Sequence, residues 1–301
     1  MKHIQYLILS AVLFTSIVIA KEEVKLSWQA TQVKDGLYML SGVGGFTGGN
    51  LGLSVGKDGV ILIDDAMPST LVIMNDAISN ITKKPIDFLI NTHVHGDHAG
   101  NNEYMGDNGV HIVAHENLLN HLLTKGVQAA DGSMKPAPKS SLPVITFSKS
   151  IDFHLNGMKA HVFHLPHAHT DGDSAIHFSD ANVIHMGDTF FNGMFPYIDA
   201  NSGGSLDGYI EAQKTVLALV DDETQIIPGH GPLATKNDLV NSIAMLEEAR
   251  ILVSQLVKTG KTEDEVLEIN PLEEKYGSLS WGFITTKKMT RQVYHGVTQA
   301  E

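Results

Sequence analysis

Four side chains within six consecutive residues carry the strongest chemical signal in the sequence: His93, His95, Asp97 and His98. They directly follow residues 86–90, an apolar run that predicts a strand. Alternate residues of an extended chain point to one side, so His93 and His95 can address one metal ion. The intervening glycine lets the chain turn, and Asp97 and His98 can then face a second ion. Imidazole nitrogens with a carboxylate suit Zn²⁺ and can also hold iron or manganese.

Three later segments each place a histidine or an aspartate after a short apolar run. These residues are His169 after residues 159–165, Asp188 after residues 183–184, and His230 after residues 226–227. Strand ends that gather on one edge of a sheet bring such loops together. We therefore expect the four segments to meet and to complete a site that one loop cannot form.

The elements that must position these segments alternate between strands and helices. Strands are expected at residues 37–40, 51–55, 60–63, 86–90, 110–114, 151–155, 159–165, 175–178, 183–186 and 225–227. Helices are expected at residues 68–79, 115–124, 206–220, 236–258, 262–268 and 281–294, and a loop at residues 126–143. Two strand-rich groups followed by helices predict an α/β domain with sheets packed face to face and helices outside.

In this order the four segments resemble the pattern of the metallo-β-lactamase-fold hydrolases: His-x-His-x-Asp-His, a His before Thr, a Gly-Asp and a Gly-His. The resemblance covers about residues 36–232. It implies a four-layer αββα sandwich with two Zn²⁺ ions per chain at its edge. The ligands that it implies are divided between the ions, with His93, His95 and His169 on the first, Asp97, His98 and His230 on the second, and Asp188 bridging both.

One histidine competes with another for the first ion. His167 lies on the same side of an extended segment as His169 and could replace it. We favour His169 because Thr170 follows it, as the family pattern requires.

The expected chemistry is hydrolysis. Two divalent cations about 3.5–4 Å apart lower the pKa of a shared water toward 7, so a metal-bridging hydroxide would attack a carbonyl carbon. Asp97 would ligate the second ion, orient the hydroxide and carry a proton to the leaving group. The sequence has no cysteine and no Gly-x-Ser-x-Gly elbow, which favours direct hydrolysis without a covalent intermediate.

Composition narrows the partners of the chain to small molecules. The 301 residues include 21 Lys and Arg against 34 Asp and Glu, a net charge of −13 with no basic run, which argues against nucleic acid. Aspartate at position 188 excludes the β-lactamase subclasses that bind the second ion through cysteine. A bridging aspartate instead resembles glyoxalase II, lactonases and alkylsulfatases. The sequence leaves the oligomeric state open.

The N-terminus predicts export. Residues 1–20 have a short basic start, an apolar run and small residues before a charged stretch, as a secretory signal does. The mature domain would span residues 21–301, lie in the periplasm or outside the cell, and have no membrane segment after cleavage. Export argues against the cytoplasmic glutathione thioester of glyoxalase II.

Three residues are candidates for substrate contact. Phe46 is the apolar tip of a glycine-rich loop that resembles the hairpin covering the site in secreted β-lactamases. Asn192 and Tyr197 lie in an aromatic segment directly after Asp188. The sequence thus predicts a secreted binuclear zinc hydrolase that cleaves a β-lactam or a lactone. The alternatives are a glyoxalase II-like thioesterase or another ester or sulfate hydrolase, a mononuclear iron sulfur dioxygenase, and a non-catalytic periplasmic zinc-binding protein.

Overall fold

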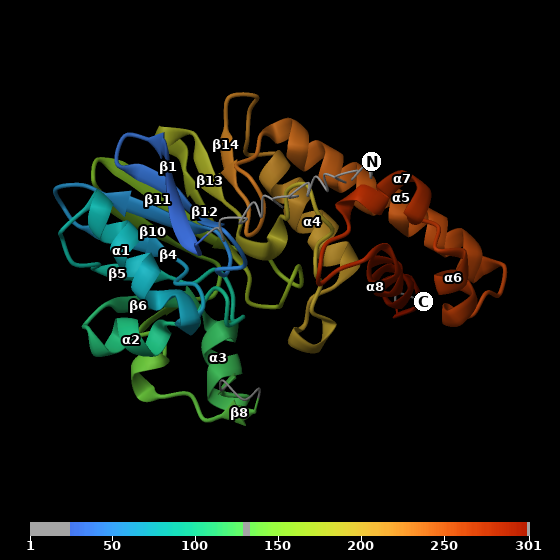
Figure 1. The fold of residues 1–301 in the computed structure, drawn as a ribbon, viewed down its shortest axis with the longest axis horizontal. Helices are drawn as coiled ribbons and strands as arrows, with labels where there is room; N and C mark the ends of the chain where they lie inside the picture. Colours follow the sequence, from blue (N-terminus) through green and yellow to red (C-terminus); the bar gives the residue numbers. More distant parts are fainter. Residues whose placement is uncertain (1–24, 129–132, 300–301) are drawn as a thin grey trace, which may run out of the picture.

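The computed structural model describes residues 25–128 and 133–299 (Figure 1). The expected signal, residues 1–20, lies outside them. Two sheets pack face to face, and helices cover their outer sides (Figure 1). This arrangement confirms the α/β fold with αββα layers. None of the described helices is long and apolar enough to cross a membrane.

The first sheet has seven strands and contains the strand that leads to the histidine-rich motif. Its order is β1 (Ser27–Lys34), β2 (Leu37–Val43), β3 (Leu51–Val55), β4 (Val60–Ile63), β5 (Phe88–Ile90), β6 (His111–His115) and β9 (Ile145–Phe147). The pairs from β1 to β4 are antiparallel, and those from β4 to β9 are parallel. The carboxyl ends of the parallel strands therefore share one edge.

The second sheet has five strands and supplies the other three segments. Its order is β10 (Ser150–Leu155), β11 (Met158–His164), β12 (Ser174–Phe178), β13 (Val183–His185) and β14 (Gln225–Ile227). Only β13 and β14 pair in parallel within this sheet.

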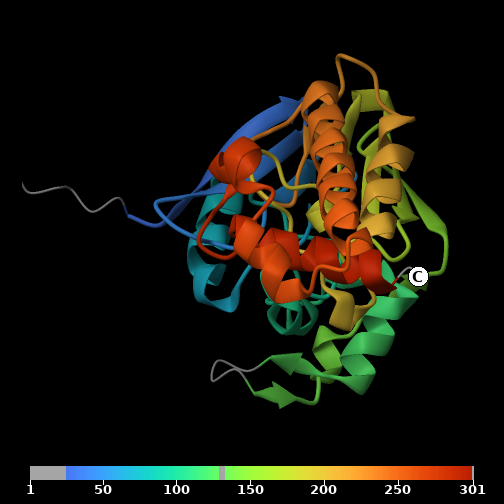
Figure 2. The same ribbon diagram turned by 90° about the vertical axis from the view of Figure 1, so that its right-hand side faces the viewer.

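The helices form the outer layers and a C-terminal group (Figure 2). On the side of the first sheet lie α1 (Leu71–Ile81), α2 (Asn102–Asp107) and α3 (Glu116–Thr124). On the second lie α4 (Leu206–Leu217) and α5 (Lys236–Lys258). The C-terminal group adds α6 (Glu263–Ile269), α7 (Glu273–Tyr276) and α8 (Thr286–Gln299), which pack with α4 and α5.

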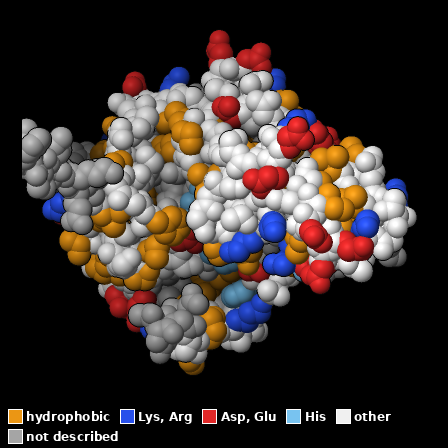
Figure 3. All heavy atoms as spheres, turned by 45° about the vertical axis from the view of Figure 1, so that its right-hand side comes forward, with side chains coloured by type: hydrophobic (Ala, Val, Ile, Leu, Met, Phe, Trp, Pro, Cys, Tyr) orange, Lys and Arg blue, Asp and Glu red, His pale blue; other side chains and the backbone are white. Residues whose placement is uncertain are grey.

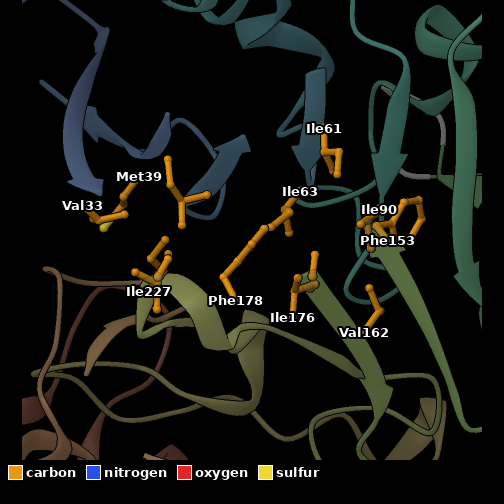
Figure 4. Close-up of a cluster of buried hydrophobic side chains, with 14 of the residues drawn as sticks. Val33, Met39, Ile61, Ile63, Ile90, Phe153, Val162, Ile176, Phe178 and Ile227 are labelled. Carbon is orange, nitrogen blue, oxygen red and sulfur yellow. The ribbon is translucent and has the colours of Figure 1, made fainter. Parts of the chain in front are cut away.

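The alternation of apolar side chains along the strands explains the layers. In β4, Ile61 and Ile63 belong to the core between the sheets, whereas Val60 and Leu62 belong to the cluster that includes α1. All four are buried, because this strand is covered on both faces. Figure 4 shows Ile63 facing Phe178 of the second sheet. This packed core fixes the edge that carries the site.

Several boundaries agree with the sequence predictions, but the last helix is a correction. It begins at Thr286 and not at Trp281, because the Thr285 hydroxyl accepts a hydrogen bond from the Lys288 backbone at 3.3 Å and caps the helix. A turn with a 3.0 Å bond from Trp281 N to Ile284 O precedes the cap. Trp281 and Phe283 therefore lie in a loop.

The predicted loop at residues 126–143 also needs correction, because it contains the short hairpin β7 (Val127–Gln128) and β8 (Met134–Lys135) beside α3 (Figure 2). The strands β1 and β9 and the helix α2 were not predicted. Here β1 exposes most of its side chains, β9 has three residues and α2 has six, so none provides a long apolar period.

Candidate metal centre

The seven side chains that the sequence singled out lie together at one edge of the sandwich. They stand on the loops after β5, β11, β13 and β14. Their nitrogen and oxygen atoms form two groups, each with the atoms within 4.8 Å of one another. The first group comprises His93, His95, His169 and Asp188, and the second group comprises Asp97, His98 and His230.

Asp188 stands between the two groups. Its Oδ1 lies 3.0 Å from His98 Nε2 and 3.5 Å from His230 Nε2, while its Oδ2 lies 3.4 Å from His169 Nε2 and 3.7 Å from His93 Nε2. The glycine before His230 is required here, because a Cβ at Gly229 would lie 2.0 Å from Asp188 Oδ1. One carboxylate thus presents one oxygen to each group.

In the first group, the outer ring nitrogens of two histidines meet acceptors. His169 Nδ1 lies 2.7 Å from the Tyr197 carbonyl, and His95 Nε2 lies 3.0 Å from Asp199 Oδ2. If the outer nitrogens carry the hydrogens, the inner nitrogens, which are 2.8 Å apart, present two lone pairs to each other. Such a pair repels unless a cation or a proton lies between, which fits a metal ion.

The remaining histidine of the first group supports the same fit. Among the described residues, the buried Nε2 of His93 has no hydrogen-bond partner. Its Nδ1 lies 3.0 Å from the Thr92 hydroxyl, which donates to Asp64 at 2.8 Å. Buried polar atoms are normally paired, so an unpaired nitrogen that lies among carboxylate and imidazole atoms suits a metal ligand.

The second group depends on a buried carboxylate that the sequence analysis missed. Asp64 follows β4 directly, and its Oδ2 lies 2.8 Å from His98 Nδ1. Its Oδ1 accepts a hydrogen bond of 2.7 Å from the Thr92 backbone. Asp64 adopts the left-handed conformation with φ of 59°, which is uncommon for a side chain other than glycine. The sequence signal that could have identified Asp64 is its position directly after a predicted strand.

Carboxylates raise the pKa of the second-group histidines. Burial alone lowers the pKa of His98, but Asp188, Asp97 and Asp64 outweigh it and raise the pKa well above 6.5. Burial likewise lowers the pKa of His230, but Asp188 and Asp97 outweigh burial and raise this pKa to about 9. Without an ion, both imidazoles therefore hold protons at neutral pH.

The same contacts have the opposite effect on the acids. Burial raises the pKa of Asp97, but His98 and His230 outweigh it and lower the value to about 2. Asp188 is likewise lowered well below 3.8, because His98, His230 and His93 outweigh burial. Both side chains are therefore carboxylates at neutral pH, as metal ligands must be.

In the first group, burial dominates. It lowers the pKa of His169 to about 4, and it lowers that of His93 well below 6.5 with the help of neighbouring His98. The single carboxylate within this group, Asp188, does not offset burial. These imidazoles are neutral and ready to bind at neutral pH.

The remaining predicted residues have different surroundings. His167 is exposed with φ of 52°, and its Nδ1 lies 3.1 Å from the Gly203 carbonyl, outside both groups. The Asn192 amide donates to the Pro232 carbonyl at 3.0 Å and ties two loops together. The Tyr197 ring lies 6.0 Å from that of His95. Burial and Asp199 raise the pKa of Tyr197 to about 12, so it stays protonated.

Phe46 lies against the second group. Its ring stacks on that of His230 at 5.7 Å with an interplanar angle of 17°. A pocket of about 350 Å³ adjoins it. Figure 3 shows histidine side chains in a hollow of the surface, with hydrophobic side chains along one side of it and charged side chains also near it. The candidate metal centre is therefore reachable from solvent beside Phe46.

The chain belongs to the metallo-beta-lactamase superfamily, because the model of that family matches residues 44–230, more than half of the sequence. The match covers all seven side chains of the two groups. Most enzymes of the superfamily are metal-dependent hydrolases that act on small molecules. A comparison with curated protein sequences returned no match.

Solved structures with this fold include several enzymes. A metallo-beta-lactamase from Pontibacter korlensis is 18% identical with a TM-score of 0.60, and the match covers 73% of this chain and 99% of that one. The metallo-beta-lactamase FIM-1 from Pseudomonas aeruginosa, in its mono-zinc form, is 19% identical with a TM-score of 0.59 over 74% and 96%. The inverting sec-alkylsulfatase Pisa1 from Pseudomonas sp. is 17% identical with a TM-score of 0.66. That match covers 89% of this chain but half of the sulfatase.

Proposed function

We propose that this chain is a secreted binuclear zinc hydrolase, related to the β-lactamases, that cleaves a β-lactam or a lactone. The observation that carries the proposal is the position of Asp188, with Oδ1 3.0 Å from His98 Nε2 and Oδ2 3.4 Å from His169 Nε2. A carboxylate placed in this way can serve two ions at once. Because position 188 is an aspartate and the chain has no cysteine, the ligand atoms of the metal centre would be nitrogen and oxygen only.

The seven residues would hold the two ions, and these would supply Lewis acidity and an acidified water. Asp97 is the protein group best placed to handle protons. Its side chain is 23% exposed against 4% for Asp188, and its Oδ2 lies 3.3 Å from His230 Nε2. Since its pKa is about 2, Asp97 is ionised at neutral pH and can orient a water by accepting a hydrogen bond from it.

Export is part of the same proposal. The pattern of residues 1–20 supports a cleaved secretory signal and a periplasmic or extracellular enzyme. A β-lactam or lactone that arrives from outside would meet an enzyme there. Mass spectrometry of the mature N-terminus tests this point: we expect it at Lys21, and an intact Met1 would contradict export by cleavage.

The test of the activity is metal analysis combined with a substrate panel. The purified protein should contain about two zinc ions per chain and prefer a chromogenic cephalosporin or a homoserine lactone over an aryl ester, an alkyl sulfate and a glutathione thioester. A preference of about a hundredfold is about 2.8 kcal/mol of transition-state discrimination. Asp97→Ala should abolish turnover, whereas Asp222→Ala, a matched change at a side chain that is 92% exposed, should not.

Other outcomes would replace the proposal. Preference for the sulfate, the simple ester or the thioester would indicate another hydrolase of the same fold. One iron ion per chain would favour an oxygenase. Zinc binding with no turnover on any substrate would favour a metal-binding protein.

A further inference from the structure

Apart from His230 itself, the side chains that line the pocket beside the second group are uncharged. Besides the imidazole, its larger members are Phe46, Met194, Pro232 and Trp281, and the described residues around it include no lysine, arginine, aspartate or glutamate. Away from His230 and the metal ligands, a charged group would lose its hydration here without gaining a counterion. The chemistry of the lining therefore favours an apolar group.

Trp281 is held firmly in this wall. Its indole N–H donates to the Phe195 carbonyl at 2.9 Å, so the polar end of the ring is satisfied away from solvent. The Phe195 backbone in turn donates to the Leu279 carbonyl at 2.9 Å. Trp281 also lies 6.2 Å from Phe191, ring to ring. The loop before α8 is thus fixed to the loop after Asp188.

Three aromatic rings beside the metal centre lie at angles of 29° or less to the His230 ring. The rings of Phe46, Phe191 and Trp281 lie at 17°, 29° and 29° to the His230 ring, with centroids 5.7, 4.9 and 6.4 Å away. Phe46 is 56% exposed, a large apolar surface that gains free energy when a ligand covers it. Flat faces of this kind favour a flat apolar partner.

We propose that Phe46 and Trp281 form a subsite for a flat, apolar group of the substrate, next to the second group of metal ligands. Trp281 stands outside the family match at residues 44–230, so this chain supplies part of its specificity from the C-terminal segment. The proposal rests on the proposed function for its meaning in catalysis. The binding that it predicts can be measured without turnover.

The tryptophan content of the chain makes a direct test practical. Trp28 and Trp281 are the two tryptophans of the sequence, and Trp28 is buried in β1. In a Trp28→Phe protein loaded with zinc, emission reports on Trp281 alone. We expect phenylacetamide to change this emission and to bind about tenfold more tightly than acetamide, which is followed by calorimetry. Unchanged emission at saturating phenylacetamide would overturn the subsite.

Two variants and a control locate the effect. Phe46→Ala alters an exposed loop residue, and calorimetry should show about tenfold weaker phenylacetamide binding with unchanged zinc content. Trp281→Leu should also weaken phenylacetamide binding about tenfold and leave the zinc content unchanged. The control is Ile251→Ala, at a 54% exposed residue of α5 outside the pocket lining, which should bind as the parent does. Parent-like binding by Phe46→Ala would contradict the proposal even if Trp281→Leu failed to fold.

Failure of the subsite and failure of the proposed function give different results. A protein that binds phenylacetamide through Trp281 but hydrolyses nothing in the panel keeps the subsite and loses the function. A protein that hydrolyses a lactone or β-lactam but ignores the phenyl ring loses the subsite and keeps the function.

Discussion

The two ligand groups share an edge of the sandwich and one aspartate, yet they differ in charge. In the first group, burial keeps His93 and His169 neutral. In the second, several carboxylates face His98 and His230 and keep them protonated when no ion is bound. The difference teaches that sites with similar ligands need not bind with equal ease, because an ion entering the second group must first displace protons.

Removing the shared aspartate should have the largest effect. We expect Asp188→Ala to lower kcat/KM by about a thousandfold, about 4 kcal/mol, because both groups lose a ligand at once. Elemental analysis should show fewer than two ions per chain. The comparison between the groups would fail if this variant kept both ions and near-parent turnover, with Asp222→Ala as the surface control.

Acid should separate the two groups. Because the pKa of His230 is raised to about 9, its proton is present below that value, and zinc affinity there falls about tenfold per pH unit per proton displaced. His169, lowered to about 4, stays neutral until the pH approaches that value. Between pH 8 and pH 6 displacement of the His230 proton alone should therefore weaken binding of the second ion about a hundredfold, the His98 proton should add to this loss, and the first ion should change less.

Competition with a chromophoric chelator measures both affinities across this range. Equal losses at the two groups would mean that their protonation does not differ as the structure indicates. The affinity of the first group alone can be followed in an Asp97→Ala protein, which lacks a second-group ligand. Loss of the first-group ion at a higher pH than the second-group ion would contradict the expected order.

The buried support of the second group gives a smaller, more selective effect. Asp64→Asn keeps a side chain that tolerates φ of 59° but removes the charge beside His98. We expect second-group zinc affinity to fall about 10- to 100-fold with little change in the first group. Asp87→Asn is the matched control, since Asp87 also accepts a backbone hydrogen bond, from Val60 at 2.8 Å, away from the site. Equal effects of the two changes would indicate general destabilisation.

The ligands were predictable because their signal is local. His93, His95, Asp97 and His98 lie within one short segment, and the other three each follow a strand of apolar residues. Strand ends then bring these segments together whatever the loop lengths. Asp64 follows β4 in the same way, so the strand-end rule could have found it.

Other features depended on contacts that no spacing reveals. Asp199 lies in an irregular segment and meets His95 across 104 positions of the chain. The sequence predicts a helix that includes Trp281, because the apolar pattern begins several residues before the true start of the helix at Thr286. The cap at Thr285 is a single weak signal in the sequence. Specificity is thus harder to predict than ligation, because it depends on which loops the C-terminal helices bring to the rim.

The support of the first group should yield the smallest effect. Asp199 holds His95 by a 3.0 Å contact, with side-chain exposures of 11% and 24%. Since water reaches this pair more easily than the buried Asp64 and His98, Asp199→Asn should weaken first-group zinc affinity by less than about tenfold. The same chelator competition measures it, with Asp64→Asn beside it. If zinc affinity fell only at the second group, Asp199 would not act through His95. If zinc affinity fell as much as in Asp64→Asn, burial would not set the strength of this support.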